Sequence, residues 1–137
     1  MRTFLIISLC WSCMGLHAET ITYFGTNTFQ PVSIEHLQQS GVKIDVYNLD
    51  APLNFENEVS KDLPLNNVEL ATEIARSRVA KYTEQQMKDL FMGAFTARKW
   101  EIQQLPAVVF EDGKFAIYGM TNIGQAYQIY RSKRGAQ

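Results

Sequence analysis

Both cysteines of this 137-residue chain lie near its start, inside an apolar run that covers residues 3–15. The run follows the positive charge of Arg2 and is followed by a small residue, Ala18. A short positive start, an apolar run and a small-residue end are the layout of a secretory signal peptide. We therefore predict that residues 1–18 are a signal peptide, cleaved after Ala18, and that the mature chain, residues 19–137, is exported to the periplasm.

Two other interpretations of the leader remain open. It could stay uncleaved as a membrane anchor, although it is shorter than the ~20 apolar residues that span a bilayer as a helix. It could also be a lipoprotein leader processed at Cys10 or Cys13, although the large Leu9 before Cys10 fits that poorly. Cleavage after Ala18 would leave a mature chain without cysteine and without a transmembrane span. Its hydrophobic core alone would then hold it together, which is feasible at this length.

The spacing of Cys10 and Cys13 matches the C-x-x-C motif of redox enzymes. A working C-x-x-C requires a thiolate stabilised at a helix N-terminus beside a sheet, which an apolar leader does not provide. The sequence contains no phosphate-binding loop and no serine elbow. A lone His36 is expected to face solvent from a helix. We therefore predict a protein that is not an enzyme and that uses no cofactor and no metal.

The charge balance argues against nucleic acid as a partner. The chain has 13 Lys and Arg against 14 Asp and Glu, for a net charge of -1. A protein that binds a phosphate backbone needs a surplus of cations. No nucleic-acid binding is therefore expected.

Four β-strands are predicted from β-branched and aromatic runs. Residues 42–49 give a clear signal, since apolar and polar residues alternate there as in a half-buried strand. The last two strands form a hairpin, because the Asp112-Gly113 pair readily adopts the positive φ that its turn requires. The predicted strands are residues 21–24, 42–49, 105–110 and 115–118.

Helices are predicted between and after these strands. Residues 32–39 form the first, with Pro31 in its first turn and Gly41 at its end. Thr121 caps the last helix, which continues through Tyr130. Three cations lie at the C-terminal end of that helix, where they suit the helix dipole or contact an acidic partner: Arg131, Lys133 and Arg134.

A long helical insert, residues 53–103, separates the second and third strands. Capping pairs are predicted at Asn66 with Glu69 and at Thr83 with Gln86. Apolar residues at helical spacing predict a face packed on the core rather than a cofactor site. These residues are Leu70, Ile74 and Val79 in one helix, and Met87, Leu90, Phe91, Ala94, Phe95 and Trp100 in the next.

The order of the elements predicts an α/β fold. A helix between the first two strands implies that they pair in parallel, and the hairpin makes the last pair antiparallel. The order β-α-β-α-β-β-α is that of the thioredoxin fold, here with the helical insert before the third strand. In that fold a proline, usually after a cis peptide bond, precedes the third strand. Pro106 occupies that place.

Several segments, in their order and spacing, resemble those of a known family. They are Phe24 to Pro31, Val46-Tyr47-Asn48-Leu49-Asp50, Ala75-Arg76-Ser77-Arg78, Leu105-Pro106-Ala107-Val108-Val109-Phe110 and Tyr118-Gly119. The sequence resembles the thioredoxin-like integrating conjugative element proteins of unknown function. It is more distantly similar to the periplasmic pilus-assembly proteins of F-type conjugation. The resemblance implies an accessory protein of a conjugative type IV secretion apparatus, whose partners are other envelope proteins of that apparatus.

The loop after the first strand carries no sulfur at the position where a thioredoxin needs its thiolate. What remains is a surface between that loop and the proline. We hypothesise that Thr26, Phe29, Leu105 and Pro106 line a groove that binds an extended peptide. Alternatively, Phe29 belongs to the core and Pro106 only shapes a turn. The resulting function is a non-enzymatic binding protein, with a chaperone-like holdase or a thiol–disulfide oxidoreductase as alternatives.

Overall fold

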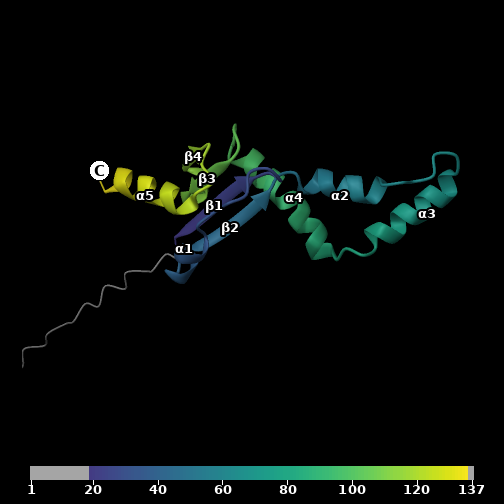
Figure 1. Cartoon of the computed structure of the whole chain (residues 1–137), viewed down its shortest axis with the longest axis horizontal. Helices are drawn as coiled ribbons and strands as arrows, with labels where there is room; N and C mark the ends of the chain where they lie inside the picture. The colour runs from purple at the N-terminus through teal and green to yellow at the C-terminus, as the bar shows by residue number, and fades with distance from the viewer. Residues whose placement is uncertain (1–18, 136–137) are drawn as a thin grey trace, which may run out of the picture.

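The computed structural model describes residues 19–135 as a mixed α/β fold with one four-stranded sheet and five α-helices (Figure 1). The predicted signal peptide, with Cys10 and Cys13, lies outside the described residues. The strands are β1 (Thr20–Gly25), β2 (Lys43–Asn48), β3 (Ala107–Phe110) and β4 (Phe115–Tyr118). The helices are α1 (Glu35–Gln39), α2 (Ala51–Ser60), α3 (Val68–Val79), α4 (Glu84–Lys99) and α5 (Ile123–Arg134).

The sheet has the strand order β2-β1-β3-β4. β1 and β2 are parallel, with Tyr23 opposite Val46, whereas β3 is antiparallel to both β1 and β4. Both pairings predicted from the order of elements are confirmed. The predicted hairpin turn is confirmed as well, with a φ of 54° at Asp112 and 98° at Gly113.

One face of the sheet forms the larger part of the core. Alternate residues of β1 and β3 point to this face, which α1 and α5 cover. Tyr130 of α5 stacks on Phe110 of β3 with ring centroids 4.2 Å apart. The buried cluster consists of Ile21, Tyr23, Leu37, Val108, Phe110, Ile123, Ala126 and Tyr130.

The other face of the sheet is covered by α4. Phe24, Val109 and Ala107 meet Ala97 there, and Trp100 packs edge-on against Phe24 at 5.9 Å. Only small residues of α4 are buried, namely Gly93 and Ala97. The helix can therefore lie very close to the strands.

The first predicted helix begins later than its sequence pattern indicated. Val32 forms an isolated parallel bridge with Asn122 instead, in which its amide donates to the Thr121 carbonyl at 2.9 Å. Ser33 then takes a φ of 64°, which is outside the helical region. The prediction that Pro31 lies in the first turn is wrong, because pairing with the segment before α5 holds this stretch extended.

Two of the three predicted helix caps are displaced by one residue. The side chain of Asn67, not Asn66, accepts from the Leu70 amide, and that of Asn122, not Thr121, accepts from the Gln125 amide. The third cap, at Thr83, is confirmed as a complete capping box with Gln86. In both cases the helix begins one residue later than predicted, and the asparagine before its first residue provides the cap.

The core face predicted for the insert is wrong for Phe91 and Phe95, whereas Trp100 packs against the core as predicted. Phe91 is 49% exposed and Phe95 is 68% exposed, because α4 turns Gly93 and Ala97 toward the sheet. Neither α2 nor α3 contains a buried residue. These two helices project away from the sheet, on the opposite side from α5 (Figure 1), and we call residues 51–79 the helical arm. Among residues 19–135, no helix has the length and apolar character needed to cross a membrane.

Candidate functional site

The predicted groove residues lie at one end of the sheet. Phe24 at the end of β1 pairs with Ala107 at the start of β3. The loop after β1 and the Leu105-Pro106 segment therefore lie at the same edge. Pro106 is buried, it follows a cis peptide bond, and its carbonyl accepts from the Gly119 amide at 2.8 Å.

Thr26 shapes the loop that follows β1. Its side-chain oxygen accepts from the backbone amides of Thr28 at 3.3 Å and Phe29 at 3.2 Å. The Phe29 carbonyl in turn accepts from the hydroxyl of buried Tyr23 at 3.1 Å. Phe29 itself is 42% exposed, so it is a surface residue and not part of the core. The structure thus offers an exposed aromatic ring on an anchored loop.

An exposed network of polar side chains lies beside this loop and was not predicted. Asn27 is its centre: its amide donates to Asp50 at 2.8 Å, its side-chain oxygen accepts from Asn48 at 2.8 Å, and its side-chain nitrogen donates to Asn54 at 3.0 Å. Asn48 is the last residue of β2 and Asp50 follows it, at the carboxyl end that lies beside that of β1. Polar residues directly after two predicted parallel strands were the available signal.

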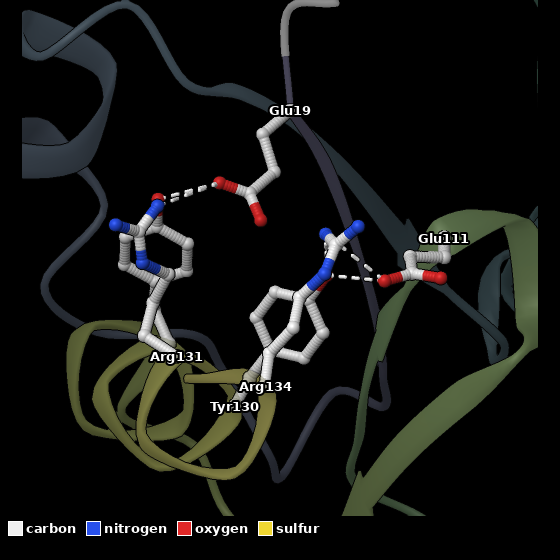
Figure 2. A network of polar contacts seen from close by, with 6 residues as sticks. Glu19, Glu111, Tyr130, Arg131 and Arg134 are labelled. Carbon is white, nitrogen blue, oxygen red and sulfur yellow. Dashed lines mark hydrogen bonds and ion pairs between the residues drawn. The ribbon is translucent and has the colours of Figure 1, made fainter. Parts of the chain in front are cut away.

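A second cluster of functional groups lies at the opposite end of β1, where α5 ends (Figure 2). The Glu111 carboxylate accepts from the Tyr130 hydroxyl at 2.6 Å and lies 3.1 Å from the Arg134 guanidinium. Glu19 accepts from the Tyr127 hydroxyl at 2.6 Å. Arg131, 3.9 Å from Glu19, also lies over the Tyr127 ring. These contacts tie both ends of the described chain to the sheet.

The two tyrosines of this cluster are held in their protonated form. Burial and the hydrogen bond to Glu111 raise the pKa of Tyr130 above its ordinary value. The hydrogen bond to Glu19 and burial raise the pKa of Tyr127. The Tyr130 hydroxyl and the nearby Arg134 lower the pKa of Glu111. A shallow cleft of about 350 Å³ opens beside Tyr130 and Arg134.

The comparison with family models covers most of the described chain. Residues 26–135 match the model of a family described as "Protein of unknown function (DUF1525)". The chain belongs to the DUF1525 family. No curated protein and no solved structure matches it.

The matched segment contains the loop and proline region of this DUF1525 chain and, apart from Glu19, the cluster at the end of α5. It begins at Thr26, the first residue of the loop after β1, and it includes Pro106 and the whole of α5. Within residues 19–135, no group of three His, Cys, Asp or Glu side chains is placed to hold a metal ion. His36 is exposed on α1, as expected.

The lowered pKa of Glu111 predicts a loss of stability in acid. A carboxyl whose pKa is lower in the folded state stabilises the fold above the unfolded value, 4.5, and this contribution disappears as the pH falls through the folded value. We expect Glu111→Gln to lose less stability than the unsubstituted protein between pH 5 and pH 3 (about the range over which carboxyls titrate). Urea unfolding at both pH values measures this.

The control for this experiment is Glu56→Gln, which removes an exposed carboxylate from α2, far along the chain from the cluster. Its acid sensitivity should equal that of the unsubstituted protein. An equal acid sensitivity of the Glu111→Gln variant would contradict the prediction.

Proposed function

We propose that this DUF1525 chain is an exported, non-enzymatic accessory protein of a conjugative type IV secretion apparatus, and that it binds other envelope components through a thioredoxin-like fold. The topology supports the fold assignment. A parallel β1-β2 pair flanks α1, an antiparallel β3-β4 hairpin follows, and Pro106 precedes β3 after a cis bond. Its resemblance to conjugative element proteins supports the setting.

The observation that carries the non-enzymatic assignment is the structure of the loop after β1. A thioredoxin-like redox enzyme needs a thiolate in this loop. Here the loop is Thr26-Asn27-Thr28-Phe29, and the Thr26 hydroxyl accepts hydrogen bonds from two loop amides. An alcohol forms no disulfide, and this one has a structural role. The loop is therefore suited to binding rather than to electron transfer.

Binding is assigned to the groove between this loop and the proline segment. The Phe29 ring provides exposed apolar area, and the partly buried Leu105 precedes Pro106 at the same edge of the sheet. An extended peptide that enters such a groove gains apolar contact with the side chains and hydrogen bonds with the main chain. The partner is then an envelope protein that presents an extended segment.

Conjugation itself provides the first test. In donor cells that lack this gene, transfer frequency should fall, and the unsubstituted protein should restore it. Phe29→Ala should restore transfer poorly, because it removes the exposed ring and leaves the Phe29 carbonyl bonded to Tyr23. Val32→Ala, which shortens another exposed side chain nearby, is the control and should restore transfer fully. Unchanged transfer without the gene would contradict the proposal.

Insulin reduction tests the non-enzymatic part separately. The purified exported protein should give no turnover above the uncatalysed rate with a small-molecule thiol. Turnover would support the alternative of a thiol–disulfide oxidoreductase.

A holdase is the second candidate, and the exposed apolar side chains of the insert favour it. Leu65 is completely exposed and Val68 is 77% exposed, which is unusual for large apolar residues. A holdase should suppress the aggregation of an unfolded client without forming a stable complex with it. That result would support this function over that of an assembly subunit.

A further inference from the structure

The helical arm lacks the apolar packing that normally stabilises helices in water. Short helices are marginal alone and depend on burial of one face. α2 and α3 bury no residue. Phe55 of α2 packs edge-on against Tyr82, just after α3, at 5.0 Å, and the Arg78 guanidinium of α3 donates to the Val59 carbonyl of α2 at 2.8 Å. Leu65, between α2 and α3, and Val68, at the start of α3, are exposed. An uncovered apolar surface of this kind marks a site of association.

A second uncovered apolar surface lies on the outer side of α4. Phe91, Met92 and Phe95 follow the spacing of one helix face, opposite to the buried Gly93 and Ala97. Phe95 is 68% exposed and points away from the sheet. We call Phe91, Met92 and Phe95, with the exposed flanking cations Lys88 and Lys99, the α4 patch.

The arm has a hollow of the complementary kind. A shallow depression of about 380 Å³ runs along α3, lined by Val68, Glu69, Thr72, Glu73 and Arg76. Its lining combines Val68 with two carboxylates and one guanidinium, that of Arg76, whereas the α4 patch combines protruding rings with two ammonium groups. The two surfaces therefore carry net charges of opposite sign. The apolar side chains of both surfaces are exposed in the single chain, so the two surfaces do not cover each other within it.

We propose that a second copy of this chain covers both surfaces: the α4 patch of each protomer packs against the α3 hollow of the other. The Phe95 ring enters the hollow, and Lys88 and Lys99 lie near Glu69 and Glu73 of the other copy. In the pair that we propose, the contact is reciprocal: each protomer gives one patch and receives one, and the assembly closes as a two-fold dimer rather than extending head to tail. α3 projects from the body of the fold (Figure 1), and Glu69 and Glu73 of the hollow are exposed. This inference does not depend on the proposed function.

Sedimentation equilibrium of the purified exported protein provides the first test. We expect a dimer whose population rises with concentration. Phe95→Ser should raise the dimer dissociation constant roughly a hundred- to ten-thousandfold, because the two-fold symmetry removes one buried aromatic side chain from each of the two contacts. Val32→Ser removes another exposed apolar side chain, which lies outside both surfaces, and should leave the constant unchanged. Circular dichroism confirms that both variants are folded.

Charge reversal tests the complementarity directly. One variant reverses the patch (Lys88→Glu and Lys99→Glu), and the other reverses the hollow (Glu69→Lys and Glu73→Lys). Each alone should dimerise weakly, because like charges then face each other at both contacts. A mixture of the two should form a heterodimer, because both contacts are again complementary.

Three outcomes would overturn the proposal. They are a monomer at every concentration, a Phe95→Ser dimer as tight as the unsubstituted one, and a charge-reversed mixture that stays monomeric. A monomer that binds anionic phospholipid vesicles through Phe95 would assign the α4 patch to a membrane surface instead. Loss of the dimer with unchanged conjugative transfer would leave the proposed function standing, so the two proposals can fail separately.

Discussion

Replacement of Phe110 by alanine is expected to lower the free energy of unfolding by about 3–5 kcal/mol. Phe110 is 1% exposed at the end of β3 and belongs to the larger core cluster. Its ring stacks on Tyr130 at 4.2 Å and meets Phe115 at 6.2 Å. Truncation removes the transfer free energy of the ring and leaves a cavity between the sheet and α5, because the neighbouring strands cannot collapse into it.

Urea unfolding at neutral pH, followed by far-UV circular dichroism, measures this loss. Val46→Ala is the control, since it also shortens an apolar strand residue but one that is 45% exposed on the edge strand β2. Its cost should stay well below that of Phe110→Ala. Equal losses for the two variants would show that the core is not centred on the contact between β3 and α5.

The strands and their order could be predicted because the signals for them are local. Alternation along residues 42–49 marks β2, and the Asp112-Gly113 turn fixes the β3-β4 hairpin. The insert was predicted less well for a physical reason. Periodicity shows that Phe91 and Phe95 share a helix face, but it does not show which face meets the sheet. Gly93 and Ala97 decided that, since small residues allow the closer approach.

The candidate site shows the same difference between features with a local sequence signal and features that depend on tertiary packing. The position of Pro106 before β3 and of Thr26 after β1 followed from the order of the elements. The Tyr127–Glu19 hydrogen bond, by contrast, joins residues 108 positions apart, and the ion pair of Arg134 with Glu111 depends on how α5 lies on the sheet. Such partners have no local signal. The cations of α5 were therefore expected at a helix end, and their carboxylate partners were not predicted.

Substitution of Gly93 by alanine is expected to destabilise the protein by about 1–2 kcal/mol, although alanine is the better helix former by about 1 kcal/mol. Gly93 is buried where α4 crosses β2. A β-carbon there would lie 2.8 Å from the Tyr47 β-carbon and 3.3 Å from a Leu49 methyl carbon. The Tyr47 β-carbon is fixed to the backbone of β2, so α4 itself must shift away from the sheet.

Gly124→Ala provides the matched control, because it makes the same change near the start of α5. A β-carbon at Gly124 would come no closer than 3.4 Å to its neighbours, which is an ordinary contact. This variant should be neutral or slightly more stable, as helix propensity alone dictates. Chemical unfolding of the two variants separates the effect of helix propensity from the effect of the close contact between α4 and β2. Equal stability changes would mean that α4 does not rest directly on β2. A selective loss for Gly93→Ala would show that the close contact with β2 sets the position of α4, and with it the orientation of its exposed Phe91 and Phe95.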